Sequence, residues 1–431
     1  MSSAFREPDW LSPGVAIERI LGAVVRLDTE TVQLMDAPGR TLASDVVAPC
    51  DHPPWDNSAM DGYAVRSEDV RGAQATAPRF LVVTETVPAG AFPRSAVGPG
   101  QAIRIMTGAP IPAGADGVIR LEDTTVLDDG RIAVNAGTDA GRNIRSRGED
   151  IGAGQVVLRE GTQLRAGEIG VLAAVGKSAV SVTRRPVVAI LSTGDELVDL
   201  DAFDEVLTGR RIVNSNSWTL AAATVAVGGI PLRLGIARDD AADIRRLLGG
   251  ALDADVLVTT AGASVGEHDL VKDALERMGA RTLFWRVRIR PGSPFVFAVL
   301  DRADRAPLPI FGLPGNPVSA LVTFEILVKP ALRRMLGRRD VHPGTFPVRV
   351  AEPIESKAGL MRFLRVRLRR DGAGEWWAEL TGNQGSGILT SVAQADALLV
   401  VPIDVETIEA GRRMTAVPLG AVDAAQTEPG F

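Results

Sequence analysis

Between Arg185 and Leu336, short apolar segments alternate with amphipathic ones, and this alternation limits the possible folds more than any other feature. The short segments are rich in β-branched residues, and the longer ones begin at polar caps and end near glycine. Strands that alternate with helices form a parallel sheet covered on both faces, so we expect an α/β domain. The expected strands are 186–191, 211–213, 232–236, 255–260, 281–289 and 309–311, and the expected helices are 217–227, capped by Ser215 or Asn216, 240–252, 269–278 and 317–332.

The flanking segments carry other patterns. Ser12 and Pro13 precede apolar residues at helical spacing, which predicts an amphipathic first helix. Short β-rich runs between Gly/Pro turns indicate a β-rich insertion, and further alternating runs after Gly337 indicate a smaller β domain. The expected strands are 79–83, 102–106, 117–121 and 131–134 in the insertion, and 346–350, 363–368, 376–380 and 397–401 in the last domain. Residues 421–431 are polar without periodicity, so we expect a disordered tail.

Composition excludes several kinds of site. The chain has 431 residues, too many for one core, and its 1 Cys and 3 His exclude an intramolecular disulfide and a thiolate metal cluster and argue against an imidazole-rich site. A bound metal is therefore expected to be a hard cation on carboxylates. The formal net charge of -6 argues against a nucleic-acid partner. The sequence shows neither a bilayer-spanning apolar run nor a signal-peptide core, which predicts a cytoplasmic protein without a membrane partner.

Every loop that follows an expected strand of the α/β domain is small, polar or acidic. Ligands of open α/β sheets bind beyond the carboxyl ends of the strands, so these loops should converge on one binding rim. The candidate residues on this rim are Ser192, Thr193, Gly194, Glu196, Asn216, Asp239, Gly262, Ser264, Gly266, Asp269, Pro314, Gly315, Asn316 and Pro317.

The rim residues have the chemistry of a nucleotide and metal site. The glycines of the 262–266 loop would let backbone N–H groups approach a phosphate at a helix N-terminus. Glu196, Asp239 and Asp269 could share a Mg²⁺ ion, and the 312–317 turn suits a bound oxyanion. Each piece also has a structural reading as a turn or a helix cap. Their joint occurrence at the ends of several strands favours a site.

Six motifs, in order along the chain, carry a resemblance to a known family. They are 56–64 (DNSAMDGYA), 106–110 (MTGAP), 147–151 (RGEDI), 192–197 (STGDEL), 264–269 (SVGEHD) and 312–320 (GLPGNPVSA). The chain resembles molybdopterin molybdotransferases, called MoeA in bacteria and the E domain of gephyrin in animals. The resemblance covers roughly residues 14–420.

The resemblance implies a multidomain protein and a homodimer. It divides the chain into an elongated first domain (14–48 and 143–183), an inserted β-rich domain (49–142), a molybdopterin-binding α/β domain with a parallel sheet (184–338) and a C-terminal β-barrel-like domain (339–420). The family's cleft lies between the α/β domain of one subunit and the insertion of the other.

The implied reaction inserts molybdate into adenylyl-molybdopterin, with Mg²⁺ as cofactor and release of AMP. By motif, the implied catalytic residues are Asp61, Thr107, Glu196, Asp239 and Asp269, with Pro314 and Pro317 shaping the site. Asp61 or another carboxylate would move protons. Arg290, Arg365, Ser386 and Ser391 are implied to bind the ligands. A molybdopterin adenylyltransferase is a candidate partner, because it would supply the adenylylated substrate.

Two departures from the family pattern leave alternatives open. Ser293 stands where many relatives have a second lysine, which predicts weaker molybdate binding unless Arg290 supplies the missing charge. Asn214 replaces a common acidic residue. The alternatives are a molybdopterin adenylyltransferase, a non-catalytic scaffold, or a specialised paralogue with another anion preference.

Overall fold

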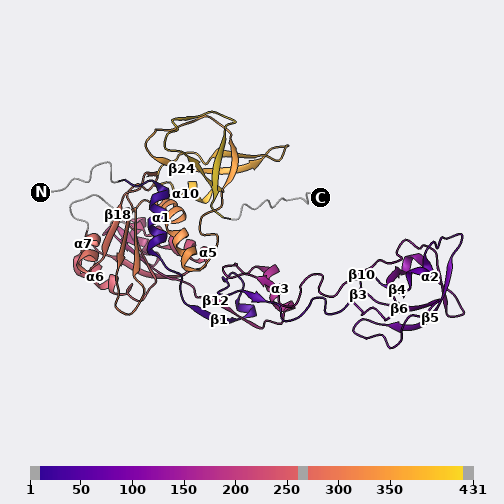
Figure 1. Ribbon diagram of the computed structural model, residues 1–431. Coiled ribbons are helices and arrows are strands. Elements are labelled where there is room, and N and C mark those ends of the chain that lie inside the picture. Colours follow the sequence, from indigo (N-terminus) through magenta and orange to yellow (C-terminus); the bar gives the residue numbers. More distant parts are fainter. Residues whose placement is uncertain (1–9, 261–269, 421–431) are drawn as a thin grey trace.

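The computed structural model describes residues 10–260 and 270–420 of the chain. It consists of an α/β body, a barrel packed beside the body, and a long arm that leaves the body and ends in a separate lobe (Figure 1). None of the helices in these residues is long and apolar enough to cross a membrane.

The body is built on a six-stranded sheet with the order β16-β13-β17-β21-β20-β18. Four neighbouring strands, β16, β13, β17 and β21, are parallel, so their carboxyl ends meet at one edge. The strands are β13 (Val187–Thr193), β16 (Ile230–Ala237), β17 (Val256–Thr260), β18 (Arg281–Trp285), β20 (Val296–Leu300) and β21 (Leu308–Leu313).

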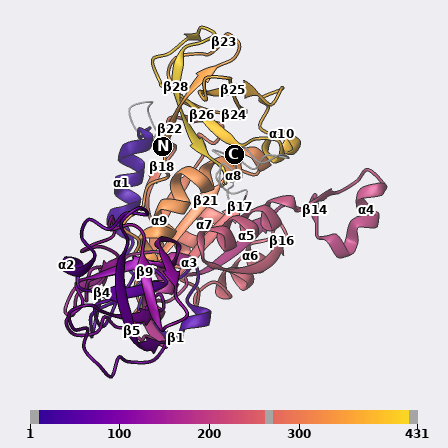
Figure 2. The ribbon, with the colours of Figure 1, turned by 90° about the vertical axis from the view of Figure 1, so that its right-hand side faces the viewer.

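Side chains of β13 alternate between two hydrophobic cores, as expected for a strand buried on both faces. Val188 and Ile190 belong to the core under one group of helices, whereas Ala189 and Leu191 belong to the core on the other face. The first group is α1 (Pro13–Ala23), α5 (Ser215–Val227), α8 (Pro317–Thr323), a π-helical turn (Phe324–Val328) and α9 (Lys329–Met335). The opposite face carries α6 (Ala241–Gly249) and α7 (Leu270–Arg277) (Figure 2).

Three sequence expectations for the body need correction. The sheet is mixed, because β20 and β18 run antiparallel at one side. The segment 211–213 contributes only β15 (Ile212–Val213), which pairs with β14 (Leu197–Val198) outside the main sheet. These two short strands carry a projecting segment with α4 (Phe203–Leu207) (Figure 2). Helix α5 is capped by Asn214, whose side chain accepts from Ser217 N, and not by Ser215 or Asn216.

The arm has a middle part and a lobe, each with its own core. The middle part contains β1 (Thr29–Gln33) paired with β12 (Ala179–Thr183), β2 (Val46–Val47) paired with β11 (Val156–Leu158), and α3 (Ala166–Ala174). The lobe follows the pair β3 (Asn57–Ser58) and β10 (Ile144–Arg145), and its sheet order is β7-β4-β6-β5-β9-β8. Its strands are β4 (Gly62–Val65), β5 (Arg79–Val87), β6 (Gln101–Ile105), β7 (Gly117–Arg120), β8 (Thr124–Val126) and β9 (Arg131–Val134).

The C-terminal part is a closed barrel of five strands in the order β24-β25-β22-β28-β26, closed by pairing of β26 with β24. The strands are β22 (Phe346–Val350), β24 (Met361–Arg370), β25 (Trp376–Leu380), β26 (Ala397–Val401) and β28 (Arg413–Pro418). A short strand of the body, β19 (Ile289–Arg290), pairs with β24 and joins the barrel to the α/β part.

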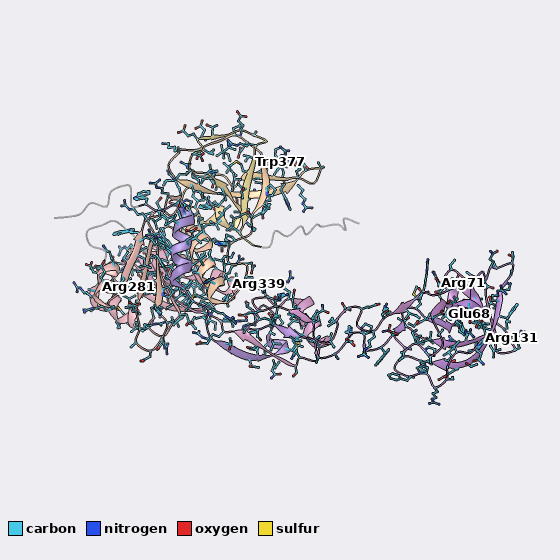
Figure 3. The ribbon with its side chains drawn as sticks, viewed as in Figure 1. Glu68, Arg71, Arg131, Arg281, Arg339 and Trp377 are labelled. Atoms are coloured by element: carbon cyan, nitrogen blue, oxygen red, sulfur yellow. The ribbon has the colours of Figure 1, made fainter. Side chains whose placement is uncertain are left out.

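The expected multidomain fold, with an α/β domain, a β-rich insertion and a C-terminal barrel, is confirmed. The boundaries remain a prediction. Helix α1 packs in the α/β core, where Ala16 and Ile20 are fully buried, although the expected boundaries assign it to the first domain. Figure 3 places Glu68, Arg71 and Arg131 on the lobe, Arg281 on the body and Trp377 on the barrel.

Gly62 provides a test of the lobe's packing. A Cβ atom at this position would lie 2.0 Å from Ile119 O, on the neighbouring strand β7. We expect Gly62→Ala to force β4 and β7 apart and to destabilise the lobe by about 1–3 kcal/mol. Hydrogen exchange of β4 and β7 amides should accelerate. Gly170→Ala in α3, where a Cβ meets nothing within 4 Å, is the matched control and should be neutral or stabilising. Equal exchange in both variants would contradict this explanation.

Candidate active site

A cavity of about 620 Å³ lies at the carboxyl ends of the parallel strands. We call it the rim cavity. It is lined by the last residues of β13 and β17, by residues that follow β13, β15 and β21, and by two residues at the start of α10 (Leu389–Ala393). The lining residues used below are Thr193, Glu196, Asn214, Asn216, Thr260, Gly315 and Asn316. Loops that are far apart in the sequence therefore meet at one edge, as the strand order requires.

A chain of buried polar groups forms the floor beside this cavity. Ser192 Oγ lies 2.8 Å from Thr260 Oγ1 and donates to Asn214 Oδ1 at 3.0 Å. Because the Ser192 hydroxyl hydrogen is used on Asn214, Thr260 must donate to Ser192. The three side chains are buried and hold β13, β17 and the start of α5 in a fixed relation.

Glu196 and Asp239, two of the predicted metal ligands, lie on the turns that follow β13 and β16, and these turns are hydrogen-bonded to each other. Gly194 N donates to Ala237 O at 3.3 Å, and Asp239 N donates to Asp195 Oδ1 at 3.3 Å. Gly194 has a φ of 143°, and a Cβ there would lie 2.6 Å from Glu196 Oε2, so only glycine lets the carboxylate fold back over the turn. Glu196 lines the rim cavity, whereas Asp239 is exposed on the neighbouring turn.

The turn after β21 is held to the start of α5. Asn216 Nδ2 donates to Gly315 O at 2.7 Å, and Pro317 occupies the first turn of α8. Asn316 lines the rim cavity and also a second cavity beyond the turn. Pro317 also lines the rim cavity, and the predicted shaping role of Pro314 and Pro317 stays a prediction.

Of the three predicted metal ligands, the structure describes Glu196 and Asp239 but not Asp269. Gly262, Ser264, Gly266 and Asp269 lie outside the described residues. Within residues 10–260 and 270–420, no group of three His, Cys, Asp or Glu side chains is close enough to hold a metal ion. The set of Glu196, Asp239 and Asp269 therefore stays a prediction.

The second cavity, of about 730 Å³, lies between the body and the barrel, and we call it the arginine cavity. Arg290, Arg362 and Arg365 line it, together with Ser293 and Ser386, and no carboxylate of the described residues belongs to the lining. Arg290 and Arg362 are paired residues of β19 and β24. An uncompensated cluster of guanidinium groups favours a bound anion.

Burial shapes the electrostatics of this cavity. Burial lowers the pKa of Arg365, whose side chain is 0% exposed, and its Nε donates to Ser391 Oγ at 3.1 Å. Burial and then the charge of Arg290 lower the pKa of Arg362. Arg362 Nε is buried and has no hydrogen-bond partner in the described part of the chain. Ser293 Oγ donates to Ile289 O, so its hydroxyl hydrogen is used within the chain, and its neutral side chain adds no charge to the cavity.

Asp61 and Thr107, each implied to be catalytic by the family motifs, are in contact in the arm lobe. Asp61 Oδ1 accepts from Thr107 N at 2.7 Å and from Thr107 Oγ1 at 2.8 Å. The Thr107 N–H first, then its hydroxyl, and then the charge of Arg104 lower the pKa of the Asp61 carboxyl. Asp61 directly precedes β4, which lies at the far end of the arm from the body (Figure 1). Within one chain, the lobe and the rim cavity are therefore separated by the length of the arm.

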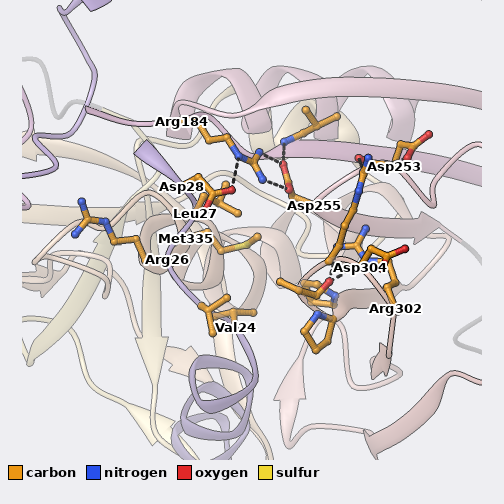
Figure 4. Close-up of a pocket in the computed structure, with 16 residues that line it drawn as sticks. Val24, Arg26, Leu27, Asp28, Arg184, Asp253, Asp255, Arg302, Asp304 and Met335 are labelled. Carbon is orange, nitrogen blue, oxygen red and sulfur yellow. Dashed lines mark hydrogen bonds and ion pairs between the residues drawn. The ribbon is translucent and has the colours of Figure 1, made fainter. Parts of the chain in front are cut away.

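A further cavity, of about 750 Å³, lies at the amino ends of the strands, where the arm joins the body (Figure 4). Its charges satisfy one another. Arg184 donates twice to Asp255, at 2.6 Å each, and Val187 N donates to the same carboxylate at 2.8 Å. Arg302 donates to the carbonyls of Leu252, Ala254 and Ala306. The Arg184–Asp255 pair fastens the arm to the body, and Arg302 joins loops within the body, so these groups have little free binding capacity.

The structure adds site residues that the sequence reasoning missed. Thr260 was placed within a strand, and Arg362 carried no signal because arginines are frequent along β24. Asn214 was noted only as a departure from the family pattern, although an Asn before a helical segment is a typical cap.

The Asp61–Thr107 contact predicts how the pKa of the Asp61 carboxyl responds to loss of the Thr107 hydroxyl. Because the pKa of Asp61 is lowered, the contact is fully formed above the ordinary carboxyl pKa and is lost as pH falls through the lowered value. Thr107→Val removes the hydroxyl and keeps the backbone N–H. We expect the pKa of Asp61 to rise part of the way to its ordinary value, as measured by carboxyl NMR titration. An unchanged pKa would mean that the hydroxyl bond is not formed in solution.

Comparisons with known proteins agree with this architecture. Residues 11–176 match the MoeA N-terminal region (domain I and II), residues 189–334 a probable molybdopterin binding domain, and residues 347–419 the MoeA C-terminal region (domain IV). A molybdopterin molybdenumtransferase from Nostoc sp. is 38% identical over 91% of this chain and 89% of its own, and one from Haemophilus influenzae is 34% identical over 90% and 94%. The crystal structure of a molybdopterin biosynthesis MoeA protein from Pyrococcus horikoshii matches with a TM-score of 0.80 and 32% identity, over 95% of this chain and 100% of that one. The chain therefore belongs to the MoeA family.

Proposed function

We propose that this protein inserts molybdenum from molybdate into adenylyl-molybdopterin and releases AMP. The observation that carries the proposal is the pair of cavities that meet at Asn316. The rim cavity offers one carboxylate and several neutral hydrogen-bonding groups, which suit a large polar ligand. The arginine cavity offers positive charge, and its described lining holds no carboxylate, which suits a small oxyanion such as molybdate. The two substrates would thus be held side by side.

Mg²⁺ fits the residues present, because it commonly keeps several waters and binds through one or two carboxylates and substrate phosphates. Glu196 lines the rim cavity, and Asp239 lies on a neighbouring turn, where its backbone N–H donates to Asp195, the residue before Glu196. We propose Glu196, Asp239 and Asp269 as its holders. When bound, the ion would neutralise phosphate charge and polarise the phosphoanhydride that is cleaved.

The arm supports a homodimer with shared clefts. Asp61 and Thr107 lie on the lobe, at a distance from the rim cavity of their own chain (Figure 1). In a dimer, the lobe of one subunit could complete the cleft of its partner. Since the lowered pKa makes Asp61 a weak base, we propose that it acts through its negative charge and by orienting a ligand group, and does not take up a proton.

A direct assay tests the proposal. The purified protein receives adenylyl-molybdopterin, molybdate and Mg²⁺, and both AMP release and transfer of active cofactor to a molybdenum-dependent apoenzyme are measured. We expect both products, each dependent on molybdate. A protein that instead consumes ATP and molybdopterin would be the adenylyltransferase alternative, and AMP release without molybdenum insertion would also contradict the proposal.

Shared clefts predict complementation between inactive variants. Asp61→Ala and Glu196→Ala proteins should each be inactive as homodimers. In a mixed dimer one cleft has both residues and the other has neither, so activity should return after subunit exchange. Two affinity tags verify the heterodimer, and a mixture of Asp61→Ala with Thr107→Ala, both in the lobe, is the control that should stay inactive. No recovery in verified heterodimers would show that both residues act within one chain.

The lining of the arginine cavity suggests which residue replaces the positive charge of the lysine that many relatives have at the position of Ser293. Arg362 faces the same cavity as Arg290, so we propose that Arg362 supplies the second positive charge. Loss of one charge-assisted contact costs about 1.5–3 kcal/mol, so Arg362→Met should raise the molybdate concentration for half-maximal activity roughly ten- to a hundred-fold.

The rescue variant makes this test specific. In the Arg362→Met background, Ser293→Lys should restore much of the lost molybdate affinity, whereas in the wild-type background it should change little. Arg367→Met, on the same strand but outside the cavity lining, is the control. If Arg362→Met leaves the molybdate requirement unchanged, the charge is supplied elsewhere.

A further inference from the structure

Asn214 carries a buried hydrogen-bond donor without a partner. The side chain is 2% exposed, and its Oδ1 accepts from Ser192 Oγ at 3.0 Å and from Ser217 N at 3.3 Å. Its Nδ2 has no partner in the described part of the chain, and the residue lines the rim cavity. Buried polar groups in native proteins are nearly always bonded, so an exception in a cavity wall points to a ligand.

The orientation of this amide is fixed by the backbone. Ser217 N can only donate, so it requires the oxygen of Asn214 and excludes the flipped amide. The nitrogen must therefore be the unbonded atom. The cap position at the start of the 13-residue helix α5 sets this orientation, independently of any ligand.

Asn216 provides a complementary group on the same wall. Its Nδ2 donates to Gly315 O at 2.7 Å, and since a carbonyl can only accept, this amide is also fixed. Its Oδ1 is buried and has no partner in residues 10–260 and 270–420. Two residues of the rim-cavity lining thus carry one unsatisfied donor, on Asn214, and one unsatisfied acceptor, on Asn216.

We propose that Asn214 and Asn216 together bind the edge of a planar heterocycle that carries an acceptor beside a donor. A phosphate fits less well, because it offers only acceptors and would leave the Asn216 oxygen unsatisfied. This inference rests on the proposed function, in which the ligand has two such edges: the lactam of the pterin and the amidine-like edge of the adenine.

Asn214→Asp isolates the donor. Asp is as good a helix cap as Asn, so the bonds from Ser217 N and Ser192 Oγ should persist. The donor is replaced by a carboxylate oxygen, and the thermal unfolding midpoint of the variant measures what the added buried charge costs in stability. The probes are pterin and adenosine, which are uncharged near neutral pH, so that the new negative charge does not itself repel them. Their binding to the full-length wild type and variant is followed by ligand-observed NMR, without turnover.

We expect Asn214→Asp to weaken one of the two probes about ten-fold, which equals about 1.4 kcal/mol. A loss confined to pterin assigns the edge to the pterin, and a loss confined to adenosine assigns it to the adenine. Asn135→Asp, on the arm lobe and away from the cavity, is the matched control and should bind both probes like the wild type.

Equal affinity of wild type and Asn214→Asp for both probes, or no binding of either by the wild type, would overturn the inference and would mean that water satisfies the two amides. The outcome is separate from the proposed function. If the wild type catalyses the reaction but Asn214→Asp binds both probes equally well, only the inference about the two amides is wrong. If Asn214→Asp weakens binding of one probe but the wild type does not catalyse the reaction, only the proposed reaction is wrong.

Discussion

The parallel pairing of β16, β13, β17 and β21 is the constraint on which the rest of the body depends. Parallel strands place all their carboxyl ends at one edge, so each following loop must contribute to the same rim. Ser192 in β13, Thr260 in β17 and Asn214 at the start of α5 are then joined at this edge through buried hydrogen bonds. The antiparallel strands β20 and β18 extend the sheet on one side and leave this edge intact. The position of the rim cavity is thus set by the direction of the strands, and no single residue determines it.

The arm imposes the second constraint. Arg184 and Asp255 fasten it to the body at the edge of the sheet opposite the rim. The lobe with Asp61 and Thr107 is carried away from the body, so the proposed contribution of these residues to the cleft requires a second copy of the chain (Figure 1). The barrel, by contrast, is joined to the body through β19 and β24, and this pairing aligns Arg290 with Arg362. One cleft would therefore combine a body, its own barrel and a partner's lobe.

Sequence patterns predicted the strands of the body and barrel well where apolar runs are short and bounded, as in β22 (Phe346–Val350) and β26 (Ala397–Val401). They missed β20, although its five residues form a short apolar run like those that were recognised, and they missed β28, in which polar residues interrupt the apolar run. The Asp61–Thr107 pair was predictable only through the family motifs, since 46 positions separate the two residues. The position of Arg362 in the arginine cavity depends on the register of β19 and β24, which no local pattern specifies. The unsatisfied amides of Asn214 and Asn216 depend on their backbone partners, which only the fold brings near.

The shared cleft is the central claim, and short-range crosslinking between subunits tests it most directly. In a Cys50→Ser background, Met60→Cys places a thiol beside Asp61 and Leu389→Cys places one in the wall of the rim cavity; both positions are exposed. The two single-cysteine proteins are mixed and treated with a short bismaleimide. The proposed arrangement predicts covalent dimers that contain one copy of each variant. An internal crosslink in a chain that carries both cysteines, with no crosslinked dimers from the mixture, would contradict it.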